Sequence, residues 1–482
     1  MTMDTALERD LPPALEGQAT RTPAAASRFR TGIGRLGLSL RGGESGSSTD
    51  RKARRFASLT FMIRVANAGL VLVTQILLAR WIGGYEFGIY TYVWAWVVLL
   101  GALTQLGLAA SAQRFVPEYV ERGEWSLLRG YVTGARWMAV ALSTAFVTAG
   151  AILIHLFSAY LDAWLVVPLY LGLACVPMFA LTSMQEGLAR SYDWPQLAMG
   201  PGYFLRPLLL IAILVGFVAT GRDLAATEVM WASLAATWVA ALVQLAMLDT
   251  RLRKSIARGP RAYAPRLWLK FAFAIYMVDG FYLLLTHCDI ILLQLFVEPD
   301  QVGIYSASVK LASVVSFVYF AVSAAAAHKF TELQVSGRGE ELNAFMRTSV
   351  RWTFLPSLAI SAAIVALGKP LLWLFGPEFV DGYPLLAILV VGLLARASVG
   401  PVERLLTMCG QQTFCALIYA SAFVLNIALN LFLVPKFGLP GAAIATATAL
   451  VVESILLFLV AKRRLGIHAF FYLPGGRPAV AP

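Results

Sequence analysis

The chain has 482 residues, of which 59% are hydrophobic and only 14% are charged, and its formal net charge is +12 at pH 7. Soluble chains carry about 25% charged residues, so this composition excludes an ordinary soluble domain. The mean hydropathy of +0.71 comes from separate apolar stretches, each near the roughly 20 residues that a helix needs to cross a bilayer. Because the positive charges lie between these stretches, they indicate membrane topology rather than nucleic-acid binding.

The predicted fold is all-α, since only helices can satisfy their own backbone amides in hydrocarbon when no barrel pattern is present. Residues 1–55 contain no apolar run and predict a disordered tail rather than a signal peptide. Residues 56–250 and 271–465 form two predicted halves, joined by a basic linker at 251–270, and 466–482 form a short tail. About twelve transmembrane helices are predicted, at 56–79, 89–112, 131–157, 164–182, 200–219, 226–248, 271–297, 302–328, 352–375, 383–408, 413–434 and 441–461.

Lys and Arg outside these spans gather on one side of the predicted membrane. The other side has only Arg80, Arg222, Lys369 and Lys436. Because cytoplasmic loops carry the excess of positive charge, we expect both termini to face the cytoplasm and the protein to lie in the cell inner (plasma) membrane. The outer loops are too short to hold a separate catalytic domain.

An internal repeat relates the two halves at a constant offset of 215 residues. A repeat that contains six spans preserves orientation, so the halves should be related by a pseudo-twofold axis along the membrane normal, with a central cavity between them. The matching segments are Leu77-Leu78 and Leu292-Leu293, Gly88-Ile89-Tyr90 and Gly303-Ile304-Tyr305, and Arg114-Phe115 and Lys329-Phe330.

Five arginines fall inside predicted spans, where an ionised group is costly unless it faces a partner or water. Arg64, Arg136, Arg206 and Arg404 lie one to two turns from a cytoplasmic helix end, and Arg396 lies nearer the midplane. Each could extend its guanidinium to the lipid headgroups. Arginines converging from several helices would instead form a basic vestibule suited to phosphate.

Four other charged residues are candidates for ion coupling or gating. Asp279 occupies the repeat position of Arg64, and Glu453 lies in the middle of its span, where it either pairs with an arginine such as Arg396 or serves transport. Asp289 and Lys310 reach nearly the same depth on adjacent antiparallel helices. An ion pair between them is therefore predicted, either as a structural pair or as a gate.

Asn426 and Asn430 lie one turn apart on one face of the eleventh span, which predicts interhelical hydrogen bonds. No P-loop, GxSxG or HExxH motif occurs, and the four cysteines form no CxxC pair. We therefore expect no catalytic residues, no cofactor and no metal centre.

The order and spacing of several stretches resemble the polysaccharide transporter family of the MOP flippase superfamily, over roughly residues 56–465. The stretches are Gln75–Arg80 with Glu86–Gly88, Asp289–Leu293 with Gly303–Lys310, Lys369–Phe379, and Asn426–Asn430 with Pro435–Gly438 and Gly441–Ala445. The lipid II flippases of this superfamily carry two additional helices, for which this chain has no room.

The resemblance implies two six-helix bundles around a cavity, and a flippase that moves undecaprenyl-diphosphate-linked oligosaccharides for O-antigen, capsule or exopolysaccharide assembly. It implies membrane lipids, polysaccharide polymerase and chain-length machinery as partners, and it gives the arginines a diphosphate to bind. A cation-coupled drug exporter of the same superfamily is the main alternative and favours an acidic, aromatic cavity. A polymerase or ligase needs a larger outer loop, and a membrane scaffold has little use for deep charges.

Overall fold

The computed structural model describes residues 46–221 and 224–471, and helices account for most of them. The first half contains α2 (Gly46–Leu103), α3 (Leu108–Glu121), α4 (Trp125–Leu156), η3 (Ser158–Tyr160), α5 (Ala163–Ser191), α6 (Pro195–Gly200), η4 (Pro201–Leu205), α7 (Arg206–Ala219) and α8 (Ala226–Ser255). The second half contains α9 (Pro265–Leu293), α10 (Pro299–Ala312), η5 (Ser313–Val315), α11 (Ser316–Val335), α12 (Gly339–Ala366), α13 (Gly368–Trp373), η6 (Pro377–Gly382), α14 (Tyr383–Val399), α15 (Val402–Met408), α16 (Gln412–Phe437) and α17 (Leu439–Leu465).

Each predicted span overlaps one helix or a run of two or three consecutive helices, and the first two predicted spans share α2. Ten helical stretches in the described residues are long and apolar enough to cross a membrane. The first of them, Val65–Glu121, has 57 residues and turns back at Gly83, whose φ of 76° lies in the left-handed region, so it contains two spans. The part of α9 at Gly280–Leu293 is a shorter apolar helix. The all-α, polytopic prediction is confirmed.

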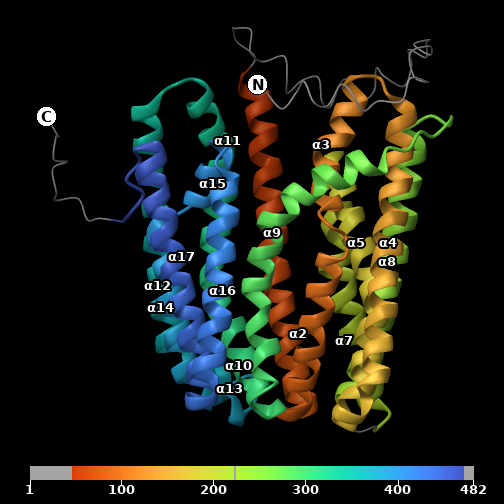
Figure 1. Cartoon of the computed structure of the whole chain (residues 1–482), viewed down its shortest axis with the longest axis vertical. Coiled ribbons are helices and arrows are strands. Elements are labelled where there is room, and N and C mark those ends of the chain that lie inside the picture. The colour runs from red at the N-terminus through yellow and green to blue at the C-terminus, as the bar shows by residue number, and fades with distance from the viewer. Residues whose placement is uncertain (1–45, 222–223, 472–482) are drawn as a thin grey trace, which may run out of the picture.

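The two halves stand side by side with long helices running in one common direction (Figure 1). We call the end that carries residues 256–264 the linker end, and the opposite end, with the turn at Gly83 and the start of α10, the hairpin end. Helices α4 and α8 lie at the edge of the first half that is remote from α12, α14 and α17 (Figure 1). Helix α9 lies between the halves and packs on α2, α3 and α16.

The halves cross at the hairpin end through glycines of the internal repeat. A Cβ at Gly88 would lie 1.6 Å from the carbonyl oxygen of Pro299, and a Cβ at Gly303 would lie 2.6 Å from that of Gly84. Gly88 is the repeat partner of Gly303, and Gly84 is that of Pro299, so each contact is the counterpart of the other. Reciprocal contacts of this kind arise across a twofold axis, which supports the like orientation of the halves that the repeat predicted.

Arg80 adds a polar connection between the halves at the hairpin end. Its Nε donates a hydrogen bond to the carbonyl oxygen of Leu374 at 2.9 Å, and its Nη2 donates to that of Trp373 at 2.8 Å. The guanidinium also lies 4.5 Å from the centroid of the Trp373 ring. Beside it, Phe87 of α2 makes an edge contact with Phe379 at 5.7 Å between ring centroids. This end of the molecule is therefore closed by direct contacts.

The apolar cores differ between the two ends. At the hairpin end one continuous core contains residues of both halves, including Phe87, Leu214, Tyr305 and Phe379. At the linker end the first half has its own core, around α3, α4, α5 and α6, which includes Trp268 of α9. The second half has another, around α11, α12, α15 and α16. Side chains of both halves thus share one core at the hairpin end, whereas at the linker end each half has its own core and the start of α9 packs into that of the first half.

Candidate functional site

A buried carboxylate, Asp289 of α9, lies where four helices of the second half meet. It is 4% exposed and accepts hydrogen bonds from Tyr305 of α10 at 3.2 Å, Thr446 of α17 at 2.5 Å and Asn430 Nδ2 of α16 at 3.0 Å. A charged side chain at this depth marks a functional site by default. No positively charged side chain lies within ion-pairing distance of Asp289 in the described residues.

Two asparagine side chains complete this group, and they confirm the predicted interhelical hydrogen bonds. Asn426 Oδ1 accepts a hydrogen bond from Cys288 Sγ of α9 at 3.1 Å and another from Asn430 Nδ2 at 3.0 Å. Asn430 Oδ1 is buried and accepts no hydrogen bond in the part of the chain that the structure describes. We call Asp289, Asn426, Asn430 and Thr446 the Asp289 cluster. Their carboxylate, amide and hydroxyl oxygens can bind a proton or a hard cation.

The predicted ion pair between Asp289 and Lys310 is wrong. Asp289 faces α16 and α17 inside the second half, whereas Lys310 lines a cavity of about 170 Å³ that it shares with Asn67 and Gln75 of α2. Equal depth on neighbouring helices sets the height of a side chain and leaves its direction around the helix open. The Lys310 ammonium donates to Ser306 Oγ at 3.4 Å and lies 5.7 Å from the Phe87 ring centroid.

The cavity beside Lys310 lies between the two halves, because α2 forms one wall and α10, η5 and α11 form the other. In the described residues no carboxylate lies within ion-pairing distance of Lys310. The volume of this cavity corresponds to about five or six water molecules at roughly 30 Å³ each, or to a phosphate group. A cation without a counter-ion in such a cavity is suited to an anionic ligand.

Arg396 and Glu453 form a second buried cluster, as one of the two alternatives for Glu453 predicted. Arg396 Nε lies 3.6 Å from Glu453 Oε1, and Glu403 Oε2 lies 4.0 Å from Arg396 Nη2. The guanidinium also lies 4.9 Å and 4.8 Å from the ring centroids of Tyr282 and Tyr319. The exposed fractions of Arg396 and Glu453 are 8% and 0%, so this arginine is enclosed within the second half.

Removing one partner of this pair should destabilise the protein strongly. Arg396→Leu leaves Glu453 buried without its cation, and such losses cost about 3–5 kcal/mol. The double variant Arg396→Leu/Glu453→Leu should recover most of this loss, since no uncompensated charge remains. The measurement is the thermal unfolding midpoint of the detergent-purified proteins. Equal midpoints for the single and double variants would show that the two groups are not coupled.

The other predicted arginines lie in separate surroundings. Arg206 follows the π-helical turn η4 and stacks on Trp94 of α2, 4.5 Å from the ring centroid. Arg136 Nη1 lies 2.6 Å from Asp249 Oδ1 in a groove between α4 and α8. Arg404 is exposed at the linker end, on α15. The side chains of the remaining two candidates, Arg64 and Asp279, lie outside the described residues.

Sequence reasoning did not single out Arg80 or the wall of the α4–α8 groove. Arg80 was counted only as a charge on the sparsely charged side, although its stretch and that of Trp373 both carry the family resemblance. Arg253, Arg258 and Arg261 were counted only as topology signals of the basic linker, and they line the groove together with Arg129. The sequence signal that could have indicated this groove was the alternation of arginines with apolar residues around 251–261.

The sequence profile of the family described as "Polysaccharide biosynthesis protein" matches residues 54–328, which is more than half of the chain. The chain belongs to the polysaccharide biosynthesis protein family. Among curated proteins, it is 21% identical to the probable low-salt glycan biosynthesis flippase Agl15 of Haloferax volcanii, over 82% of this chain and 80% of that protein.

Solved structures share the fold of this family member. An inward-facing MATE multidrug resistance transporter of the MOP superfamily matches with a TM-score of 0.68 and 15% identity, over 84% of this chain and 98% of that one. The lipid II flippase MurJ in an inward closed conformation also has a TM-score of 0.68, with 16% identity over 84% and 87%. A MOP superfamily transporter from Pyrococcus furiosus has a TM-score of 0.65 and 15% identity over 93% and 99%.

Family, relative and fold together place the chain among membrane flippases and transporters rather than enzymes. They confirm the resemblance to the polysaccharide transporters of the MOP superfamily and the membrane location of the protein.

Proposed function

We propose that this protein flips an undecaprenyl-diphosphate-linked oligosaccharide across the cell inner membrane by alternating access. The observation that carries the proposal is the cavity between the halves, where Lys310 has no carboxylate partner in the described residues. A diphosphate would supply the negatively charged partner that Lys310 lacks. The family match and the glycan flippase from Haloferax volcanii agree with this class of substrate.

The arrangement of the cores supports a state that opens toward the linker end. The halves share one core at the hairpin end and have separate cores at the linker end. The linker end carries most Lys and Arg and is therefore the cytoplasmic end, so the substrate enters from the inner leaflet. Rocking the halves about the crossing at Gly88 and Gly303 then exposes the cavity to the other side.

Among the predicted basic residues, we assign the diphosphate to Lys310 and Arg206. Neither has a carboxylate within ion-pairing distance in the described chain, whereas Arg136 has one and Arg396 has two. The Arg206 guanidinium presents planar donors that fit phosphate oxygens in pairs. Arg64 and Arg404 stay candidates for the cytoplasmic entrance.

We assign energy coupling to the Asp289 cluster. Its oxygen ligands come from α9, α16 and α17, and Tyr305 connects it to α10. Helix α10 also carries Lys310 and crosses α2. A cation that binds at Asp289 therefore changes the position of the helix that forms the wall of the substrate cavity.

The test is flipping of a lipid-linked glycan by the purified protein in proteoliposomes, together with complementation of a flippase-deficient strain. Lys310→Gln should lower the flipping rate at least about tenfold, which corresponds to the loss of one charge-assisted hydrogen bond. Lys329→Gln is the matched control, because that side chain is 42% exposed and pairs with Glu332 at the linker end of α11.

Full flipping activity of Lys310→Gln would remove this lysine from the mechanism. A deletion strain distinguishes the two functions. Accumulation of a lipid-linked glycan on the inner leaflet supports the flippase. A changed drug sensitivity without such accumulation would support a drug exporter instead.

A further inference from the structure

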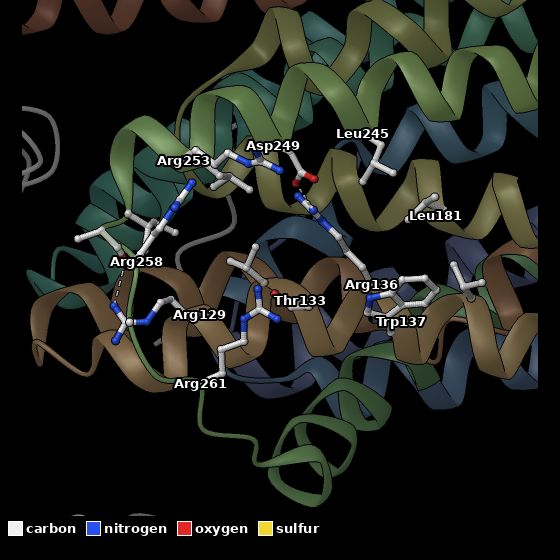
Figure 2. Close-up of a pocket in the computed structure, with 16 residues that line it drawn as sticks. Arg129, Thr133, Arg136, Trp137, Leu181, Leu245, Asp249, Arg253, Arg258 and Arg261 are labelled. Carbon is white, nitrogen blue, oxygen red and sulfur yellow. Dashed lines mark hydrogen bonds and ion pairs between the residues drawn. The ribbon is translucent and has the colours of Figure 1, made fainter.

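A groove of about 820 Å³ lies at the linker end of the first half, away from the Lys310 cavity and the Asp289 cluster. Helix α4 forms one wall and α8 the other, and Leu181 of α5 and residues of the segment 256–261 also line it. Five arginines line it and only one acidic residue, Asp249, does so. Figure 2 shows Arg136 extending from α4 to Asp249 on α8, with Arg253 and Arg258 nearby.

The end of the groove is held in place by the main chain that follows α8. Arg129 Nε donates to the carbonyl oxygen of Pro260 at 2.8 Å, and its Nη1 donates to that of Ala257 at 3.1 Å. The amide of Ala262 donates to the carbonyl oxygen of Ser126 at 3.0 Å. Because three hydrogen bonds join this segment to α4, the groove is formed before any ligand binds.

Arg136 is a buried cation that has unpaired hydrogen-bond donors. It is 8% exposed and uses Nη1 for Asp249, while its buried Nε and Nη2 have no hydrogen-bond partner in the part of the chain that is described. A buried donor without an acceptor is unfavourable, because it has lost its hydrogen bonds to water. An anionic oxygen entering the groove would satisfy these donors.

The lining changes from basic to apolar with depth. Along α4 the groove meets Arg129 first, then Arg136 and Trp137, and then Val140. Along α8 it is lined by Arg253 near the linker end and by Leu245 farther in. Trp137 is 69% exposed, as is usual for tryptophan at the level of the lipid headgroups. A ligand that matches this order has an anionic headgroup followed by hydrocarbon.

We infer that the groove between α4 and α8 binds an anionic glycerophospholipid of the leaflet on the linker side. The phosphodiester is bound by Arg136, Arg253 and Arg258, and the first part of the acyl chains lies along Val140 and Leu245. This site is separate from the transport pathway, since none of its lining residues belongs to the Lys310 cavity or to the Asp289 cluster. Its occupant therefore stabilises the first half.

The experiment measures lipid binding to the full-length protein purified in a neutral detergent, by native mass spectrometry and by the thermal unfolding midpoint. Phosphatidylglycerol should bind and raise the midpoint more than phosphatidylcholine does. Arg253→Gln/Arg258→Gln, which changes two exposed side chains, should weaken phosphatidylglycerol binding by about tenfold. Arg136→Gln should do the same and lower the midpoint of the lipid-free protein less than it lowers the lipid-bound one.

The matched control is Arg266→Gln/Lys270→Gln, which removes two exposed charges from the start of α9, outside the groove. It measures the general attraction of basic residues on this face to anionic lipid. Three results would overturn the inference: an equal loss in this control, equal binding of phosphatidylcholine, or inorganic phosphate reproducing the effect of phosphatidylglycerol at the same concentration. Because the readout is binding, failure of the proposed flipping activity would leave this test intact.

Discussion

Gly88→Ala is expected to abolish flipping, with a loss of well over tenfold in proteoliposomes. The added Cβ would lie 1.6 Å from the main-chain oxygen of Pro299, a distance at which the two helices must separate. The crossing of α2 and α10 at the hairpin end would then fail to close. Gly303→Ala should have the same effect, because its Cβ would lie 2.6 Å from the carbonyl oxygen of Gly84 in the counterpart contact.

The control for this pair is Gly69→Ala, on the same helix as Gly88, where an added Cβ meets nothing within 4 Å. It should keep wild-type flipping and expression. A thermal unfolding midpoint of Gly88→Ala close to that of the wild type, together with lost flipping, separates an open hairpin end from a misfolded protein. Normal flipping by Gly88→Ala would contradict the closing role of the crossing.

Asp289→Asn is expected to remove the dependence of flipping on an ion gradient and to lower the driven rate by at least about tenfold, since loss of a mere hydrogen-bond partner of an ion's ligand already costs about 10–100-fold. The substitution keeps the shape of the side chain and the hydrogen bond from Thr446 but removes the charge that a proton or cation needs. Flipping should be measured in proteoliposomes with a sodium gradient and, separately, with a pH gradient. The gradient that drives the wild-type protein identifies the ion.

Asp300→Asn is the matched control, since Asp300 is an exposed acid in the first turn of α10 and lies outside the Asp289 cluster. It should leave both gradients as effective as in the wild type. Gradient-driven flipping that persists in Asp289→Asn would assign energy coupling elsewhere. The two variants should also differ in ion binding. Gly88→Ala should block flipping although Asp289 still binds its ion.

The spans and the relation between the halves could be predicted from the sequence with good accuracy. Hydrocarbon imposes a length and an apolar composition on each helix, and these properties can be counted along the chain without knowing any neighbour. The glycines of the repeat could also be found from the sequence alone, since Gly88 and Gly303 occur at equivalent positions. The hydrogen bonds of Asn426 and Asn430 between helices could also be expected, since buried amides in a bilayer need partners.

The direction in which each charged side chain points was decided only by the tertiary structure. Residue number gives the depth of Asp289 and Lys310, but helix packing determines that one faces α16 and α17 and the other faces α2. The same holds for Arg136 and Arg396, whose carboxylate partners lie 113 and 57 positions away on other helices. Composition is a local property of the chain, whereas the pairing of charges depends on how rotated helices meet, so membrane insertion followed from the sequence and the assignment of the charges required the packed structure.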